Sequence, residues 1–450
     1  MLKIKSKKIG LFIGDFVLLL ASLYLALVVR WFYVPEIDVF YSHVHLFLPV
    51  FVLLIFFYYI FDFYDFSPFE TKLRLFSRIT NLHILIGVLG FGYFYIFSFL
   101  FDFSPKTIFV LLVILNSIFS VMWRLYISPS FLVPSKRFKA LLIANDEEFD
   151  ELEKAVNNHA VYHFSFVKRF KINKNEEDEE IINNLRKIID ENDISQIVID
   201  IRDEQAGKVL SFLYNRAAQR KIDVFDASLV YQDILKKMPM RGIGHFWFFE
   251  SVKLDVRAYE LTKRFIDILV ALPVFVVWIC LHPFVYIAIR LEGKGDVFIT
   301  QERYGLGGKV IKLYKYRTMT FSDKGKWLKD KDNTNKVTKV GYFLRKSRID
   351  ELPQVLAIFS GDISIVGPRP DILALGGQLS ATIPYYMMRY TVKPGLSGWA
   401  QIMQDLPPQS LEETKVRLQY DLYYVKNRSA ILDLVIIMRT FKVLILRTGM

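Results

Sequence analysis

Two adjacent carboxylates, Asp350 and Glu351, have the surroundings that best suit chemistry. Three basic residues come two to five positions before Asp350: Arg345, Lys346 and Arg348. All seven histidines lie at or before His282 and the single cysteine is Cys280, so the region that follows has no imidazole and no thiol. A Ser-His-Asp triad or a Cys-His pair within that region is therefore excluded. Carboxylates among lysines and arginines suit phosphoryl transfer, in which cations neutralise phosphate charge and a carboxylate attacks or holds a metal.

Further basic residues stand in short motifs on either side of the carboxylates. Lys315 and Arg317 belong to the run KYRTM, and Lys393 opens the run KPGLSGWAQ. Arg369 lies between two prolines in GPRPD, and the prolines hold its backbone stiffly. A rigid turn would account for the prolines but not for the arginine, whose guanidinium suits a bidentate phosphate contact.

A hairpin and a short helix are the elements expected to position the carboxylates. Strands are predicted at 297–303 and 309–316, joined by a glycine-rich turn that no helix follows, which argues against a phosphate loop. A helix is predicted from Asp350 to Gly361, with Pro353 in its first turn. The positive end of this helix and the nearby cations are expected to lower the pKa of Asp350 and keep it ionised. An ordinary helix start with a charged first turn would explain the same residues.

The chain is basic, and its apolar residues come in blocks. Of the 450 residues 53% are hydrophobic, and the formal net charge is +12. A basic excess indicates an anionic partner, and the apolar blocks favour a membrane over nucleic acid. Four apolar runs within residues 1–127 are typical of transmembrane helices: 9–29, 46–61, 79–101 and 107–123. Lysines and arginines cluster so that the positive-inside rule puts both ends of this four-helix transmembrane bundle in the cytoplasm.

Residues 128–250, which begin with a proline-containing linker, are expected to form a soluble α/β domain. Strand candidates alternate with helical stretches, which indicates a small parallel sheet of the Rossmann type. These strands are predicted at 138–144, 164–170, 196–201 and 222–226. A dinucleotide site needs a glycine-rich loop after the first strand, but Asn145-Asp146-Glu147-Glu148 stands there. A structural or regulatory role is therefore expected, with nucleotide binding as the alternative.

A further apolar stretch, 265–289, contains Pro273 and the pair His282-Pro283. Proline inside a helix kinks or breaks it. The stretch could be a fifth span, or a helix that enters the membrane, breaks and returns. The second alternative keeps the basic motifs on the side where soluble phosphorylated substrates are found.

From Lys263 onward the chain resembles the bacterial sugar transferase family, the monotopic phosphoglycosyl transferases. The segments that carry the resemblance are KRFID (263–267), QERYGLGGKVIKLYKYRTM (301–319), LRKSRIDELPQ (344–354), SGDISIVGPRPD (360–371), VKPGLSGWAQ (392–401) and YDLYYVKN (420–427). With the preceding parts the whole chain resembles the long form of this family. The implied fold is membrane α plus α/β: four transmembrane helices in 1–127, a degenerate Rossmann-like domain in 128–250, and an α/β catalytic domain in 251–450 whose re-entrant helix covers about 263–290.

The resemblance implies transfer of a sugar-1-phosphate from a UDP-sugar to a polyprenyl (undecaprenyl) phosphate lipid, at the cytoplasmic face of the bacterial inner membrane. Such a step initiates exopolysaccharide, capsule or O-antigen synthesis and releases UMP. Asp350 matches the family's nucleophile and Mg²⁺ ligand, and Glu351 matches its partner. The basic residues matched or expected around the phosphates are Lys315, Arg317, Arg345, Arg348, Arg369 and Lys393. No nucleic-acid partner is expected, and a homodimer is compatible with the long form.

Two departures from the family pattern stand out. The family's helix break is usually Ser-Pro, whereas here His282-Pro283 is the preferred candidate. Many members carry Asn-Gly-Arg one residue after WAQ, where this chain has Met403-Gln404-Asp405.

Two rival functions are open, and the first of them shares the front half of the chain. A membrane-bound nucleotide-sugar dehydratase would need a Tyr-x-x-x-Lys pair, which Tyr342 and Lys346 supply, but also a glycine fingerprint that the sequence lacks. A non-catalytic scaffold or regulator of polysaccharide export would not need the carboxylate and arginine cluster.

Overall fold

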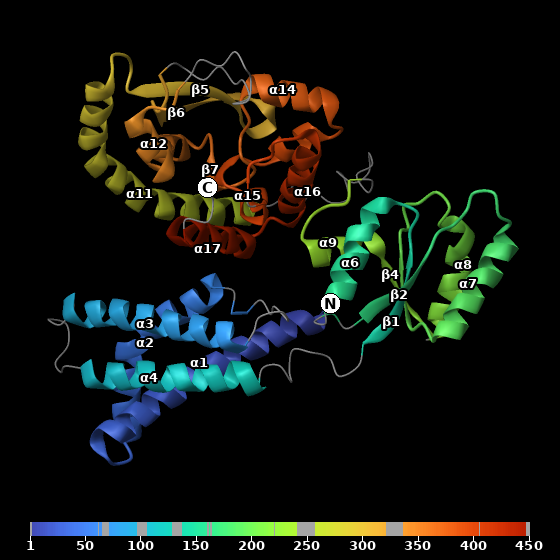
Figure 1. The fold of residues 1–450 in the computed structure, drawn as a ribbon, viewed down its shortest axis with the longest axis horizontal. Coiled ribbons are helices and arrows are strands. Elements are labelled where there is room, and N and C mark those ends of the chain that lie inside the picture. The colour runs from blue at the N-terminus through green and yellow to red at the C-terminus, as the bar shows by residue number, and fades with distance from the viewer. Residues whose placement is uncertain are drawn as a thin grey trace. The chain divides into compact units, whose positions relative to one another are not determined.

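The computed structural model describes most of the chain and divides it into two compact units, Met1–Ile234 and Leu235–Met450 (Figure 1). The described residues are 2–61, 63–64, 72–96, 106–127, 137–159, 162, 164–219, 221–240, 257–320, 336–404 and 406–446. The predicted linker at 128–135 lies outside them.

Four apolar helices open the first unit. They are α1 (Leu2–Trp31), α2 (Ile37–Ile60), α3 (Lys72–Ile96) and α4 (Lys106–Met122), which η2 (Trp123–Ile127) continues. Their inward side chains form one buried core, and each helix is long and apolar enough to cross a membrane. The chain is therefore membrane-associated. The charged Asp15 of α1 has a partner there, because Arg124 donates two hydrogen bonds to its carboxylate, at 2.6 and 2.7 Å.

The rest of the first unit is the expected parallel α/β domain. Its strands are β1 (Phe138–Ile143), β2 (Phe164–Phe170), β3 (Gln196–Ile199) and β4 (Asp223–Asp226), in the order β2-β1-β3-β4 and all parallel. The helices are α6 (Asp150–Asn158), α7 (Asp178–Asn192), α8 (Gly207–Ala218) and α9 (Ala227–Leu235). All four predicted strands are confirmed. After β1 the chain turns into η3 (Glu147–Phe149), capped by the side chain of Asp146 rather than opened by glycines.

The second unit contains the motifs between residues 263 and 427, including Asp350 and Glu351. Its elements are α11 (Arg257–Glu292), β5 (Phe298–Tyr304), η4 (Leu306–Gly308), β6 (Val310–Tyr316), α12 (Lys339–Lys346), η5 (Ile349–Gln354), α13 (Val355–Ser360), β7 (Ser364–Val366), α14 (Leu373–Thr382), η6 (Tyr386–Thr391), β8 (Gly395–Ser397), α15 (Trp399–Met403), α16 (Leu411–Asn427) and α17 (Ala430–Leu446). The predicted hairpin is confirmed as the antiparallel pair β5–β6. The predicted helix at Asp350 begins as the 3₁₀ turn η5 before it becomes α13, and it ends at Gly361 in the left-handed conformation, φ 85°.

The long helix α11 differs from the expected broken helix. It runs without interruption through Pro273 and Pro283. The helix is therefore not broken at His282-Pro283, contrary to the prediction. The ribbon instead bends sharply part-way along (Figure 1), as prolines within a helix cause. His282 packs flat against Phe298 and Tyr316 of the hairpin, which holds this part of α11 on the second unit.

The boundary between the units lies earlier than the expected 250/251. Residues after Ile234 pack with the second unit: Met238 is fully buried in its core, and its backbone N–H donates to Gln419 at 3.0 Å. The backbone carbonyl of Lys236 accepts a hydrogen bond from Trp399 Nε1 at 2.8 Å. These contacts tie the segment after α9 to α15 and α16.

Candidate active site

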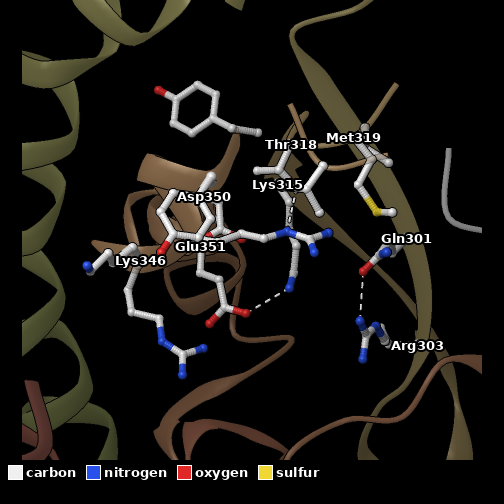
Figure 2. A pocket seen from close by; sticks show the side chains of 14 residues that line it. Gln301, Arg303, Lys315, Thr318, Met319, Lys346, Asp350 and Glu351 are labelled. Atoms are coloured by element: carbon white, nitrogen blue, oxygen red, sulfur yellow. Dashed lines mark hydrogen bonds and ion pairs between the residues drawn. The ribbon is translucent and has the colours of Figure 1, made fainter. Parts of the chain in front are cut away.

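A polar cavity of about 490 Å³ is lined by the β5–β6 hairpin, α12 and η5 (Figure 2). Its charged lining residues are Arg303, Lys315, Arg345, Lys346, Arg348, Asp350 and Glu351. Five basic side chains face two carboxylates, so the described lining is net positive even with both carboxylates ionised. Such a cavity suits a polyanionic ligand.

Strand alternation decides which hairpin residues reach this cavity. Ile299, Gln301 and Arg303 follow one another at every second position of β5, and Lys315 pairs with Ile299 across the hairpin. All four line the cavity, as residues of one face of a two-stranded ribbon should. Glu302, on the other face, is exposed.

Glu351 is the electrostatic centre of the site. Its Oε1 accepts from Lys315 Nζ and from Arg369 Nη2, each at 2.7 Å, and its side chain is only 18% exposed. Burial by itself would raise the pKa of Glu351, but the charges and hydrogen bonds of Arg369 and Lys315 outweigh it and hold the pKa well below its usual range. Glu351 is therefore an ionised, very weak base.

Asp350 sits beside Glu351, but its pKa is shifted in the opposite direction. It is 8% exposed, and no hydrogen bond joins its carboxylate to any residue that the structure describes. Burial and then the charge of Glu351 raise the pKa of Asp350, against the opposing influence of Lys315 and the nearby arginines. The cations do act to lower this pKa, but the expectation that they would determine its direction is wrong, because burial and the charge of Glu351 outweigh them. Lys315 itself is hydrogen-bonded to Glu351 (Figure 2).

A second cavity, of about 400 Å³, reaches the same carboxylate from another side. It shares Arg348 and Glu351 with the polar cavity, and Arg369 also lines it. The rest of its wall is largely apolar and includes side chains of α11 and α17: Val270, Val274, Ile437 and Phe441. Gln404, from the segment that departs from the family pattern, also lines this cavity, whereas Asp405 is outside the described residues. Glu351 thus stands where a cationic and an apolar cavity meet.

Arg369 is held in place by a buried network behind it. Its backbone carbonyl accepts from Arg389 Nη2 at 2.9 Å. Arg389, 1% exposed, also pairs with Asp371 at 2.6 Å and with Asp421 at 2.7 Å. Two tyrosine hydroxyls complete the bonds to Asp371, from Tyr386 and Tyr390, each at 2.7 Å. This network explains how a chain segment with two prolines presents its arginine to Glu351.

The structure places two of the predicted substrate-binding residues elsewhere. Arg317 donates to the backbone carbonyls of Ile289 and Gly293, at 3.2 and 2.7 Å, and so caps the C-terminal end of α11. Lys393 lies with its Nζ close to Gly361, 3.8 Å from where a β-carbon at that glycine would be. Neither is among the described residues that line the two cavities.

The structure brings the remaining predicted residues together: Asp350, Glu351, Lys315, Arg345, Arg348 and Arg369. Arg345 is oriented by a hydrogen bond from its Nε to Thr318 Oγ1 at 2.9 Å. Gln301 and Arg303 were missed, although the sequence carries a signal: they alternate on a predicted strand whose partner strand bears Lys315.

A model of the bacterial sugar transferase family matches residues 258–447, which contain both cavities. A UDP-glucose:undecaprenyl-phosphate glucose-1-phosphate transferase of Caulobacter vibrioides is 37% identical over 185 residues, or 41% of this chain and 69% of the relative. The chain belongs to the bacterial sugar transferase family. This membership excludes the dehydratase alternative, since the Tyr342 and Lys346 pair lies within the matched region.

Two other relatives extend the comparison. A UDP-N-acetylgalactosamine-undecaprenyl-phosphate N-acetylgalactosaminephosphotransferase of Aeromonas hydrophila is 31% identical over 255 residues, covering 56% of this chain and 59% of the relative. A UDP-glucose:undecaprenyl-phosphate glucose-1-phosphate transferase of Escherichia coli is 38% identical over 183 residues, covering 40% and 39%. The similarity therefore spans about 39% to 59% of the length of these two relatives.

Proposed function

We propose that this sugar transferase moves a sugar-1-phosphate from a UDP-sugar to a polyprenyl phosphate, releasing UMP, as the first step in building a bacterial surface polysaccharide. The observation that carries the proposal is the junction at Glu351 of a cationic cavity and an apolar one. A soluble diphosphate donor and a lipid phosphate acceptor need these two environments side by side. The relatives named for undecaprenyl-phosphate transfer support the same substrate classes.

The donor fits the polar cavity. A UDP-sugar is polyanionic, and the lining offers basic side chains from the hairpin and from α12. The acceptor fits the second cavity, where Val270, Ile437 and Phe441 would contact isoprenoid carbons while Arg348 and Arg369 would meet the phosphate. The two substrates then approach the carboxylates from different sides.

Asp350 is the proposed nucleophile. Its carboxylate oxygen attacks the phosphorus that bears the sugar, the bond from that phosphorus to the bridging oxygen breaks, and UMP leaves with the bridging oxygen. An oxygen of the lipid phosphate then attacks the same phosphorus and releases the Asp350 carboxylate. The lack of a described hydrogen-bond partner leaves the carboxylate available to attack, and its raised pKa makes its oxygen more nucleophilic than an ordinary aspartate once ionised.

Glu351 has an electrostatic role in this proposal. A glutamate with so low a pKa accepts protons poorly, so general-base assistance to the lipid phosphate is not its contribution. Instead it holds Lys315 and Arg369 at the cavity junction, from where both can reach phosphate oxygens as the charge moves.

Mg²⁺ is compatible with the donor set. Among the described residues no three metal-binding side chains lie together, but Mg²⁺ commonly takes only one or two carboxylates and completes its shell with waters and substrate phosphates. Asp350 would hold the ion together with the donor's phosphates, and the ion would shield their negative charges from each other.

We also propose that α11 is re-entrant and lies in the cytoplasmic leaflet of the inner membrane. Both of its ends are bonded to the same compact unit: Arg264 donates to the carbonyls of Ile358 and Phe359, at 2.5 and 2.8 Å, while Arg317 caps the other end. A straight span would carry its ends to opposite faces of a core of about 30 Å. The bend in Figure 1 brings them back toward one side.

Cysteine accessibility tests this topology. In a background with Cys280→Ser, single substitutions Lys187→Cys in α7 and Lys294→Cys after α11 should both resist an impermeant thiol reagent in intact cells. Tyr33→Cys, between α1 and α2, should react and so shows that the reagent reaches the outer face. Reaction at position 294 but not at 187 would establish a true span.

The activity is tested by UMP release. Purified full-length protein with Mg²⁺ and polyprenyl phosphate should release UMP from at least one member of a UDP-sugar panel, and the responding sugar identifies the donor. Without lipid, the protein should gain the mass of one phosphosugar, and Asp350→Asn should not. Absence of UMP release across the panel would contradict the proposal and favour the scaffold alternative.

A further inference from the structure

We infer that Arg303 binds the donor's diphosphate, through the phosphate that carries the sugar; this rests on the proposed function and adds a residue to that site. Two other cations near the carboxylates, Lys315 and Arg369, already have a partner. Lys315 and Arg369 each donate a hydrogen bond to Glu351 Oε1, at 2.7 Å. Both cations therefore already have a carboxylate partner before any ligand arrives, although the single charge of Glu351 offsets only one of the two.

Arg303 is a cation at the same place without such a partner. Among the described residues it forms no ion pair; its guanidinium donates only to neutral oxygens, Pro370 O at 2.7 Å and Gln301 Oε1 at 2.7 Å. Its Nε–H is buried and has no acceptor among them. The guanidinium therefore keeps N–H groups that a phosphate can engage.

The carboxylates nearest to Arg303 are already bound by other groups. Glu351 holds Lys315 and Arg369, and Asp371 holds Arg389 and two tyrosine hydroxyls. Burial, and then repulsion by Arg369, lower the pKa of Arg303 to about 10. A buried cation beside a like charge is costly unless an anion joins it. A phosphate between Arg303 and Arg369 would relieve that cost.

The position of Arg303 in the cavity suits this role. In Figure 2, Gln301 and Arg303 lie on one side of the cavity and Lys346 on the other, with Asp350, Glu351 and Lys315 between them. A diphosphate that presents its phosphorus to Asp350 would thus be flanked by cations from β5 and from α12. Gln301 holds one edge of the Arg303 guanidinium and so fixes the direction of the remaining N–H groups.

A purely structural role is the competing explanation, since Arg303 also tethers Pro370 next to Arg369. Calorimetry on the full-length protein with Mg²⁺ separates the two, with UDP and UMP as probes. Arg303→Met should weaken UDP binding about 10- to 100-fold, as loss of a charged hydrogen bond predicts, and weaken UMP binding much less. Lys312→Met, which removes an exposed lysine of the same hairpin, should change neither affinity.

A second variant keeps the test decisive if Arg303→Met is poorly folded. Arg303→Lys retains the charge but cannot hold Pro370 and Gln301 in the same fork, so it should bind UDP more tightly than the methionine variant. Unchanged UDP affinity in Arg303→Met, equal losses for UDP and UMP, or equal losses in Arg303→Lys and Arg303→Met would overturn the inference. Wild-type protein that releases no UMP from any UDP-sugar would instead contradict the proposed function.

Discussion

Replacing Glu351 with glutamine separates the electrostatic role of this residue from the nucleophilic role of its neighbour. The substitution keeps the size of the side chain and removes its charge. Lys315 and Arg369, which are 17% and 28% exposed, then lose their carboxylate. Glutamine can still accept a hydrogen bond from one of them through its amide oxygen.

The cost to stability follows from these two bonds. Each charge-assisted hydrogen bond contributes about 1.5–3 kcal/mol, and a neutral acceptor retains part of one, so we expect Glu351→Gln to lose about 2–4 kcal/mol. For a unit of this size the thermal midpoint should fall on the order of 10 °C. Part of Glu351's contribution also depends on pH. Because the folded pKa is depressed, that stability is present above the usual glutamate pKa and is lost as the pH falls through the folded value.

The same substitution should change the pH dependence of the first chemical step. The charge of Glu351 raises the pKa of Asp350, while Lys315 lowers it. Without Glu351 the repulsion disappears and the two freed cations act on Asp350 alone, so its pKa should fall. Formation of the phosphosugar-enzyme should then reach its plateau at lower pH than in the wild type, because Asp350 must be ionised to attack.

Single-turnover mass spectrometry measures this shift. Protein is mixed with UDP-sugar and Mg²⁺ without lipid, and the fraction carrying the phosphosugar is followed over a series of pH values. Glu302→Gln, an exposed glutamate on the other face of β5, is the matched control and should leave the profile unchanged. A profile that stays in place or moves to higher pH in Glu351→Gln would refute this account of how the two carboxylates interact.

Four shorter predictions concern other parts of the chain. Asp350→Asn should abolish turnover yet raise the thermal midpoint at pH 7. The folded pKa of Asp350 is raised, so its stabilising contribution is present only below the usual aspartate pKa and is lost as the pH rises through the folded value. Arg317→Gln should destabilise the protein, since it uncaps α11, but should leave the KM for the UDP-sugar within about twofold, as a residue outside the cavity predicts. Asp15→Asn should lower the free energy of unfolding in detergent by about 3 kcal/mol or more, because it leaves the buried Arg124 without its carboxylate partner. The doubly substituted protein, Asp15→Asn with Arg124→Gln, should recover part of the loss. Full-length protein should show no micromolar binding of NAD or NADP by calorimetry, because Asp146 and its neighbours stand where a dinucleotide loop would need glycines; a saturable isotherm would contradict this.

Local patterns in the sequence were sufficient for the elements and for singling out the adjacent carboxylates Asp350 and Glu351. Strands and hairpin follow from alternation and glycine punctuation, and the apolar helices follow from uninterrupted hydrophobic runs. These properties depend on neighbours a few positions away, so the chain encodes them locally. The absence of histidine and cysteine after His282 likewise limits the chemistry from the sequence alone.

The tertiary structure decided how charge is distributed among the site residues. Lys315 and Arg369 meet at Glu351 from positions 36 and 18 residues away, and the sequence does not state which cation each carboxylate will bind. The direction of the pKa shift at Asp350 was predicted wrongly because it depends first on burial, which only the folded chain creates, and then on the charge of Glu351. Motif membership alone assigned Arg317 to the phosphates, although the fold directs it to the end of α11. Arg303 shows the reverse case, since a strand residue that was not predicted for the site becomes a half-buried cation with no ion-pair partner among the described residues. Electrostatic pairing is a long-range property of the folded chain, whereas periodicity is a local one, and this difference separates what could be predicted from what could not.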